Sequence, residues 1–437
     1  MLTLQCISRQ FWVTIFLICF VFPQNTIAEI SQEQRTATYK QLEVFSNVLS
    51  ILQDNYVEEI DTKEVLNGAI RGLLFSLDPH SSYLPPEGFK ELQEETRGAF
   101  SGIGIEVTIK NDLLTVVSPI AETPADRAGL KANDIIIEID GEKTKKMGPY
   151  EAIKKLRGPA GSKVTISIHR EGWDELKEMT IEREVIPIQS VKADFISPGI
   201  VYTRITNFQS HTTGDYKVKL RELKKEHRID GLILDLRNNP GGLLHQAVDI
   251  TDIFLNKGTI VYTKGRRDDQ NTIFSAHDTG ENQNFPLVVL INEGSASAAE
   301  IVAGAIQAHK RGIIVGTRSF GKGSVQTIIP LPDGAGLRMT TAKYYTPDDR
   351  SIQALGIIPD VEVPFVPCAP PEKSTPKRKL IKEADLVNHL PGAEDDTESE
   401  GIQAKELEER LQIDNQLRSA YNIVKSLNLF SRYSKKD

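Results

Sequence analysis

The sequence contains few of the residues that build disulfide scaffolds or metal sites. Its 437 residues include only three cysteines, Cys6, Cys19 and Cys368, which excludes a disulfide framework. The eight histidines form no His-Glu-x-x-His motif, so neither a metal nor an organic cofactor is expected. The formal net charge of −8 disfavours nucleic acid as a partner.

Long hydrophobic runs are also lacking. The apolar stretch at residues 11–22 is too short to span a bilayer comfortably. It follows Arg9 and precedes the small residues Thr26 and Ala28, which predicts an export signal at residues 1–28. Export places the chain in the periplasm or cell envelope. An uncleaved signal, the alternative, would hold it at the inner membrane.

A serine and a lysine 25 positions apart are the candidate nucleophile and base. Ser297 lies where an apolar strand pattern, residues 286–292, gives way to a helical pattern at residues 297–307. Unpaired amides at such a helix start can bind a developing oxyanion. Lys322 follows the next strand pattern, residues 311–316, and can take the serine proton only if burial keeps it neutral.

Both motifs also have plainer interpretations. The string Gly294-Ser295-Ala296-Ser297-Ala298 is typical of a helix N-cap. The segment from Gly316 to Lys322 is one residue away from a phosphate-binding loop. However, Gly323 stands where that loop needs Ser or Thr, and residues 324–330 have a strand pattern instead of a helical one. We therefore expect no nucleotide site.

With residues 231–242, which end in Asn-Asn-Pro-Gly-Gly, these segments resemble the carboxyl-terminal processing proteases, also called tail-specific proteases. Taken alone, the Pro-Gly-Gly sequence indicates only a tight turn. The resemblance implies the site residues: the nucleophile Ser297, the base Lys322, the lysine-orienting Gln326, and the oxyanion donors Ala298 and Gly241 or Gly242.

Residues 98–185 show short strand patterns and two helical patterns separated by Gly and Asp turns, and they resemble a PDZ domain. In such domains a loop turns its backbone amides toward the terminal carboxylate of a peptide. Arg157 is either a switch that reports PDZ occupancy to the catalytic core or a solvated arginine. The resemblance places the peptide-binding loop at Gly102, Ile103, Gly104 and Ile105.

Helical patterns flank these two regions. Residues 29–97 are expected to be helical, and the turn at Asp78-Pro79-His80-Ser81 is expected to be structural, without a histidine base. Prolines and charge runs predict a linker at residues 366–401. Residues 402–437 regain a helical pattern, which either packs on the core or pairs with another subunit. The first helix has an apolar face formed by Leu42, Val44, Phe45, Val48, Leu49 and Leu52.

The expected fold is a multi-domain α/β protein. It has a helical N-terminal segment, an inserted PDZ domain built as a small β-barrel with two helices, an α/β protease core with a mixed sheet at residues 186–365, and a helical C-terminal tail. The expected function is an exported serine endopeptidase that cleaves protein substrates near free, apolar C-termini. The alternative is a catalytically idle PDZ adaptor or scaffold. The sequence leaves open whether the chain forms a homodimer or needs an adaptor protein.

Overall fold

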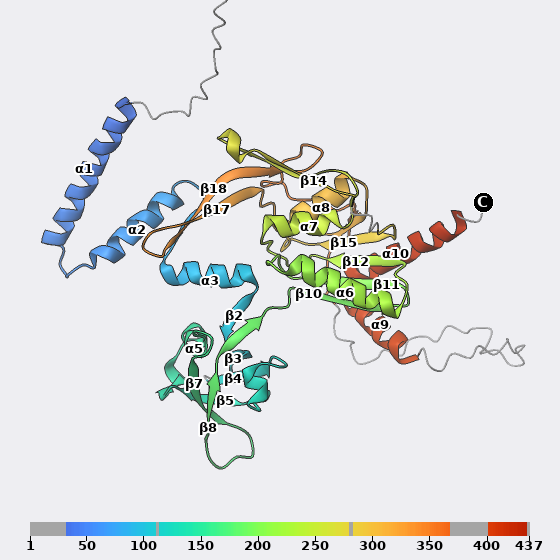
Figure 1. Cartoon of the computed structure of the whole chain (residues 1–437), viewed down its shortest axis with the longest axis horizontal. Helices are drawn as coiled ribbons and strands as arrows, with labels where there is room; N and C mark the ends of the chain where they lie inside the picture. Colours follow the sequence, from blue (N-terminus) through green and yellow to red (C-terminus); the bar gives the residue numbers. More distant parts are fainter. Residues whose placement is uncertain (1–31, 111–112, 279–282, 368–400, 435–437) are drawn as a thin grey trace, which may run out of the picture. The chain divides into compact units, whose positions relative to one another are not determined.

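The computed structural model describes residues 32–110, 113–278, 283–367 and 401–434 (Figure 1). The predicted export signal and nearly all of the predicted linker lie outside these residues. The N-terminal unit, which extends to Ile70, and the rest of the chain form two separate compact units. Within the described ranges, no helix has the length and apolar character needed to cross a bilayer.

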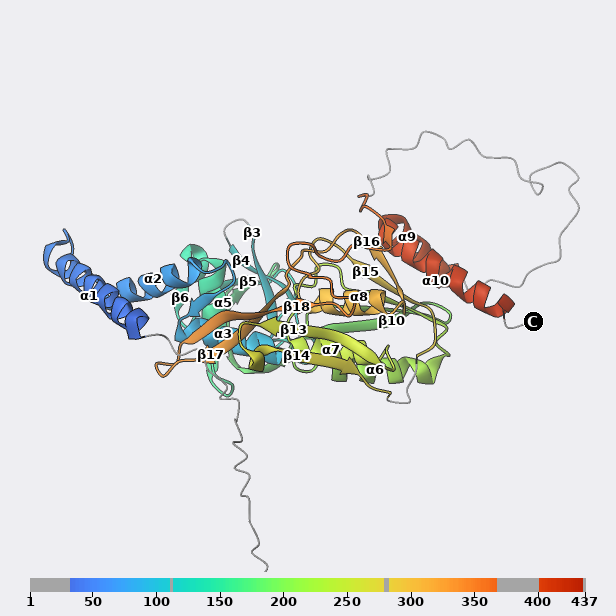
Figure 2. The same cartoon turned by 90° about the horizontal axis from the view of Figure 1, so that it is seen from above.

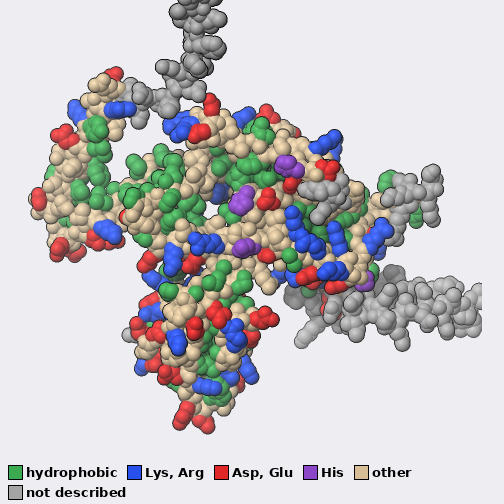
Figure 3. Space-filling view, viewed as in Figure 1, with side chains coloured by type: hydrophobic (Ala, Val, Ile, Leu, Met, Phe, Trp, Pro, Cys, Tyr) green, Lys and Arg blue, Asp and Glu red, His purple; other side chains and the backbone are tan. Residues whose placement is uncertain are grey.

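The N-terminal unit contains α1 (Gln32–Asn55) and most of α2 (Thr62–Phe75). Helix α1 is described over its whole length and has no buried residue. Figure 3 shows apolar side chains gathered along it. The predicted helix is confirmed, but its apolar side chains face solvent instead of a core: Leu42, Val44, Phe45, Val48 and Leu52 are all exposed.

The domain expected to resemble a PDZ domain is built on a sheet with the order β3-β4-β5-β7-β8, and β6 pairs with β5. Alternating apolar residues of these strands, such as Ile166 and Ile168, form its separate core. Its elements are β3 (Ile105–Lys110), β4 (Leu113–Pro119), α4 (Pro124–Arg127), β5 (Ile135–Ile139), β6 (Glu142–Lys143), η1 (Thr144–Lys146), α5 (Pro149–Leu156), β7 (Lys163–His169) and β8 (Lys177–Glu182).

A two-stranded ribbon of β2 (Ala99–Gly102) and β9 (Glu184–Pro187) joins this domain to the core of the chain. Strand β2 continues from α3 (Pro86–Arg97), and β9 leads into the core sheet. The two segments that connect the domain with the core, β2 and β9, therefore run side by side, as Figure 1 shows.

The core sheet has the order β10-β11-β12-β15-β16-β19, in which β10 is antiparallel to β11 and the other neighbours are parallel. Every residue of β12 and β15 is buried, as expected for parallel strands covered on both faces. The strands are β10 (Val191–Ser197), β11 (Ile200–Ile205), β12 (Gly231–Asp235), β15 (Leu287–Ile291), β16 (Ile313–Gly316) and β19 (Val361–Glu362).

Helices cover both faces of this sheet (Figure 2). Leu232 and Leu234 of β12 pack with α6 (Thr212–Glu226), α7 (Leu244–Asp252) and α8 (Ala298–Ala308). Ile233, between them, faces the opposite side and packs with Leu417 of α10 (Asn415–Ser434). The C-terminal helical pattern thus packs on the core, which resolves the alternative left open by the sequence.

A second sheet, with the order β1-β18-β13-β14, extends beside the core, and β17 pairs with β18. The edge strand β17 is the strand that follows Lys322. The strands are β1 (Ser82–Leu84), β13 (Gly258–Gly265), β14 (Thr272–Ala276), β17 (Ser324–Pro330) and β18 (Gly336–Tyr345).

A buried ion-pair network fixes the C-terminal helices to the end of β12. Arg237 Nη2 lies 2.7 Å from a carboxylate oxygen of Asp235 and 2.7 Å from one of Asp414. Asp414 stands between α9 (Gly401–Ile413) and α10 and accepts the Leu417 N–H at 2.9 Å. Burial opposes its charged form, but the hydrogen bonds from Arg237 and Leu417 bring its pKa below 3.8.

Replacing Asp414 by Asn should loosen α10, because one acid partner of the largely buried Arg237 is lost. We expect a destabilisation of about 1–3 kcal/mol near pH 7. Since the pKa of Asp414 is depressed, its contribution is present above its ordinary pKa and disappears as the pH falls below it, so the deficit should shrink in acid.

Hydrogen exchange along α10 measures this effect directly. The control is Glu409→Gln, which alters an exposed acid on α9. Equal exchange rates in Asp414→Asn and the control would show that the network does not hold the helix.

Candidate active site

Ser297 lies at the junction of β15 and α8 in a strained backbone conformation, with φ 53° and ψ −112°. Positive φ is uncommon for a residue with a side chain and marks a position held by its surroundings. The residue is 8% exposed and directly precedes the first turn of α8. Strand β15 and helix α8 thus present one hydroxyl at a sharp strand-to-helix turn.

The neighbouring Ser295 is placed differently. Its side chain is fully buried and its Oγ donates to the carbonyl of Leu236 at 2.7 Å. The same oxygen accepts the Asn292 N–H at 3.0 Å. Both bonding roles of this hydroxyl are therefore used within the fold.

The glycine turn after β12 packs directly on the serine junction. A Cβ at Gly241, whose φ is +104°, would approach the Ser297 Cβ at 2.8 Å and the Ala298 nitrogen at 3.0 Å. Asn239 ties the two segments together, because its carbonyl accepts the Ala296 N–H at 2.9 Å. Only a residue without a side chain fits at Gly241.

The candidate oxyanion donors differ in their hydrogen bonds. The Gly241 N–H already donates to Asn239 Oδ1 at 2.9 Å. Within the described residues, the N–H groups of Ala298 and Gly242 have no partner. The Ala298 amide is one of the unpaired donors at the start of a helix. The pair Ala298 and Gly242 therefore fits an oxyanion hole better than a pair that includes Gly241.

Lys322 lies just before β17, and its Nζ donates to Gln326 Oε1 at 3.2 Å. Burial lowers the pKa of Lys322, and the positive charge of Arg338 lowers it further. Both effects favour the neutral amine that a general base requires. Among the described contacts, no hydrogen bond joins Lys322 to Ser297.

Glu300, on the first turn of α8, joins the serine junction to the lysine loop. Its buried carboxylate accepts the backbone N–H groups of Ser297 at 2.8 Å, Gly321 at 2.7 Å and Lys322 at 2.9 Å. The Ser319 hydroxyl donates to it at 2.6 Å. Burial raises the pKa of Glu300, although these hydrogen bonds act in the opposite direction. One side chain thus fixes the backbone of both candidate catalytic residues.

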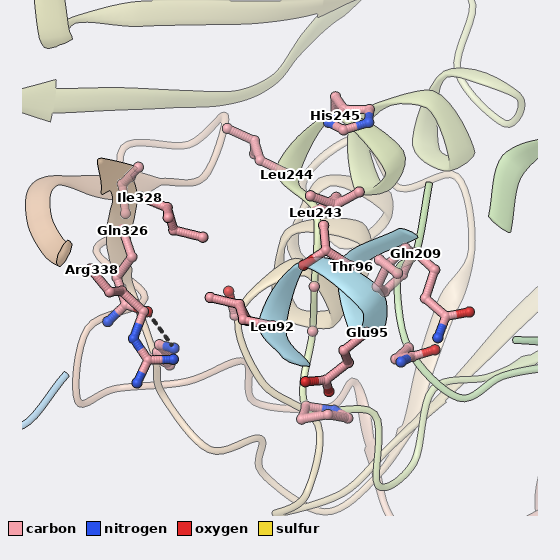
Figure 4. A pocket seen from close by; sticks show the side chains of 18 of the residues that line it. Leu92, Glu95, Thr96, Gln209, Leu243, Leu244, His245, Gln326, Ile328 and Arg338 are labelled. Atoms are coloured by element: carbon pink, nitrogen blue, oxygen red, sulfur yellow. Dashed lines mark hydrogen bonds between the residues drawn. The ribbon is translucent and has the colours of Figure 1, made fainter. Parts of the chain in front are cut away.

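Ser297 and Lys322 open onto the same cavity, which has a volume of about 470 Å³. Figure 4 shows Gln326 and Arg338 on one side of it, Leu243 and Leu244 above, and Gln209 on the other side. Residues of α3 also line it. The cavity is thus formed by elements that are far apart in the sequence.

Four polar side-chain atoms around this cavity are buried without a partner in the described structure. They are Asn207 Oδ1, Gln209 Nε2, Ser324 Oγ and Gln326 Nε2. Buried polar atoms are normally hydrogen-bonded, and exceptions gather where function requires them. The gathering of four such atoms around one cavity distinguishes it from the rest of the described structure.

Tyr344 of β18 is a further lining residue, 5% exposed. Burial raises its pKa to about 12, and the proximity of the Ser297 hydroxyl acts in the opposite direction. The phenol therefore stays protonated at neutral pH and stands beside the candidate nucleophile.

The loop expected to bind peptides lies between β2 and β3. Gly104 has φ +81°, and a Cβ there would collide with Thr123. The carbonyls of Ile103 and Gly104 accept the N–H groups of Ala125 and Ile120, both at 2.9 Å. In the described structure the N–H groups of Ile103 and Gly104 themselves have no partner.

Arg157 and His80 lie outside the cavity lining. The Arg157 guanidinium stacks 4.7 Å from the ring centroid of Phe100, on the ribbon that enters the PDZ domain. His80 is held in its turn by Asp78, which accepts its N–H at 2.8 Å. Burial and the positive charges of Lys322 and Arg338 lower the pKa of His80, more than Asp78 raises it.

Sequence reasoning missed several of these residues. The string after Ser297 contains Glu300, but nothing local indicates that it reaches the lysine loop 22 positions later. Arg338, Tyr344, Asn207 and Gln209 belong to no motif that we could identify. Strand pairing of β18 brings Arg338 and Tyr344 to the cavity, and the connection between β11 and α6 brings Asn207 and Gln209 there. In the described part of the chain, no cluster of His, Cys, Asp or Glu is suited to hold a metal ion.

Three protein-family models match most of the chain. Residues 199–363 match peptidase family S41, residues 115–170 match a PDZ domain, and residues 20–88 match the N-terminal domain of the activating protease CtpB.

Individual relatives cover almost the whole sequence. A carboxy-terminal-processing protease of Bartonella bacilliformis is 42% identical over 89% of this chain and 91% of its own length. A carboxyl-terminal-processing protease of Synechocystis is 36% identical over 82% and 89%. Among solved structures, a photosystem II D1 C-terminal processing protease is 32% identical, with a TM-score of 0.45 over 75% of this chain and 86% of its own. The chain therefore belongs to the carboxyl-terminal processing proteases, the PDZ-containing serine peptidases of family S41.

Proposed function

We propose that this protease is an exported endopeptidase that cuts protein substrates near free, apolar C-termini with a Ser297–Lys322 dyad. The observation that carries the proposal is a group of three features around a single cavity. They are Ser297 in its strained conformation, Lys322 with its lowered pKa, and the Ala298 amide, which has no partner in the described structure. A nucleophile, a base and an oxyanion donor are the parts that acyl transfer needs.

The proposed reaction has two stages. Neutral Lys322 takes the Ser297 proton as Oγ attacks the peptide carbonyl, and the amides of Ala298 and Gly242 bind the oxyanion. Collapse of this intermediate releases the amine, which takes the proton from the Lys322 ammonium, and leaves an acyl-enzyme. Lys322 then takes a proton from a water molecule as that water attacks the ester, and returns it to Ser297 Oγ when the acid product leaves, which restores the free serine and the neutral amine. Gln326 holds the lysine amine through the 3.2 Å hydrogen bond.

In the resting site the Lys322 amine contacts Gln326 instead of Ser297. Catalytic hydrogen bonds often tighten only when substrate binds. We propose that a bound peptide completes the dyad. The same resting geometry is what favours the alternative, a PDZ adaptor that holds C-termini without cutting them.

The PDZ loop is the proposed receptor for the substrate tail. Its partner-free N–H groups fit a terminal carboxylate, and the tail would add a strand to the sheet edge. Arg157 stacks on Phe100 of the ribbon that connects the loop with the core, and it is our candidate for a switch. The exposed apolar face of α1 offers a surface to either partner that the sequence raised, a second copy of the chain or an adaptor protein.

Replacing either member of the dyad should abolish cleavage. We expect Ser297→Ala and Lys322→Met to lower kcat by about 10⁴-fold or more, measured on an unfolded test protein with an apolar C-terminus. Ser295→Ala is the matched control: its hydroxyl only bonds the fold, so turnover should persist. A wild-type protein that binds the tail but never cuts it would favour the adaptor.

The acid limb of the pH profile should report Lys322. Only its neutral form is a base, so kcat/KM should fall as the pH decreases through its pKa. Because the charge of Arg338 helps to lower that pKa, Arg338→Met should move the limb to higher pH. Lys343→Met, which removes an exposed cation of the same strand, should leave it in place. A limb that Arg338→Met does not move would contradict a role of the Arg338 charge in setting that pKa.

Capture of the tail should depend on the terminal carboxylate. Amidating the C-terminus of the same test protein removes the charge that the PDZ loop is proposed to bind. We expect KM to rise by about tenfold or more, with kcat less affected. Equal KM values for acid and amide would argue against recognition of the tail end.

A further inference from the structure

Arg338 is a permanent cation in the wall of the catalytic cavity. It lies on β18 opposite Ile328 of the edge strand β17. Gln326 of β17 lies opposite Thr340, two positions further along β18. Two strand residues span about 6.6 Å, so the guanidinium is anchored within a few residues of the dyad. Figure 4 shows it beside Gln326.

The contacts of Arg338 leave most of its donors free. Its Nε donates to Ser82 Oγ at 3.1 Å, and Ser82 also pairs with it in the β1–β18 register. Among the described residues, its two terminal nitrogens have no partner, and neither is buried. The side chain is therefore oriented by one bond while the two-pronged end of the guanidinium is open.

Within the described residues, no acid forms an ion pair with Arg338, whose side chain bonds Ser82 instead. Asp78 Oδ1 accepts the N–H groups of His80 and Ser81, both at 2.8 Å, and its Oδ2 accepts the Ser81 hydroxyl at 2.7 Å. Thr340 also donates to Asp78 at 3.2 Å. Glu95 on α3 lines the same cavity but forms no ion pair with Arg338 in the described structure.

The positive field of Arg338 is felt by its neighbours. It lowers the pKa of both Lys322 and His80. The ionisable groups that face the cavity are Glu95, His245, Lys322, Arg338 and Tyr344.

We propose that Arg338 is a carboxylate-binding subsite of the catalytic cavity. The inference rests on the proposed endopeptidase function and deepens it. A planar guanidinium with two free nitrogens matches a carboxylate through parallel hydrogen bonds. The carboxylate comes from an acidic side chain close to the cut, or from the terminal carboxylate of the tail. Either source places the scissile bond a few residues from a negative charge.

The experiment measures binding, so it does not require cleavage. Ser297→Ala protein is titrated into fluorescent peptides with an apolar tail, made in matched pairs: one Glu against Gln near the cut, and free acid against C-terminal amide. In at least one of the two pairs, the carboxylate peptide should bind about tenfold to a hundredfold tighter than its neutral counterpart. Arg338→Met should bring the ratio of the two affinities close to one. Arg338→Lys should keep part of it.

Two controls test whether another cation produces the preference. Loss of Arg338 favours a protonated Lys322, which could replace the missing charge, so the titration is repeated in a Lys322→Met background. Lys343→Met removes an exposed cation of the same strand that does not line the cavity, and it should change nothing.

The outcomes distinguish the two sources. A Glu preference that depends on Arg338 assigns the subsite to a side chain, and an acid-over-amide preference that depends on Arg338 assigns it to the tail end. An acid-over-amide preference that survives in Arg338→Met belongs to the PDZ loop. If neither preference changes, the proposal is wrong, even if the protein cleaves normally.

A folding control completes the test. Thermal unfolding followed by circular dichroism checks Arg338→Met, and Ser82→Ala removes only the bond to Nε. If Arg338→Met does not fold, Ser82→Ala and Arg338→Lys replace it in the test. Both variants should show a weaker preference for the carboxylate peptide. A preference as strong as that of the wild type in both variants would overturn the proposal. With Ser297 intact, cleavage of the carboxylate peptide by Ser82→Ala should show a higher KM at similar kcat.

Discussion

The buried carboxylate of Glu300 is the constraint on which the rest of the site depends. It binds the backbone N–H of Ser297 and those of Gly321 and Lys322, so one group fixes the two segments that must meet. A carboxylate enclosed in this way is stable only while its hydrogen bonds are made. The positions of the serine turn and the lysine loop are therefore coupled, and a shift of one requires a shift of the other.

A second coupling runs through the core sheet. Arg237 follows β12 and precedes the glycine turn that packs against Ser297, and it is held by Asp235 within the sheet and by Asp414 of the C-terminal segment. The helix on the far face of the sheet thus stabilises the residues that lead into this glycine turn. Residues of α3, the glycine turn and the edge strand β17 line the cavity, so its shape depends on how these elements pack.

Local patterns predicted the serine, the lysine and the elements that carry them. The expected strand at residues 324–330 coincides with β17, and the helix expected at residues 297–307 matches α8 closely. The C-terminal pattern, expected as one helix, is interrupted at Asp414, because that side chain bonds Arg237 and caps α10. Arg338 was not foreseen, because strand pairing across β17 and β18 brings it to the cavity and no local pattern encodes that register.

The central claim is that Ser297 is acylated with Lys322 as its base. The most direct measurement is mass-spectrometric mapping of the covalent adduct formed with a slowly hydrolysed peptide ester at neutral pH. The structure predicts one adduct, on the Ser297 hydroxyl, that forms far more slowly in Lys322→Met. An adduct on Ser295, or equal labelling with and without the lysine, would contradict the assignment of nucleophile and base.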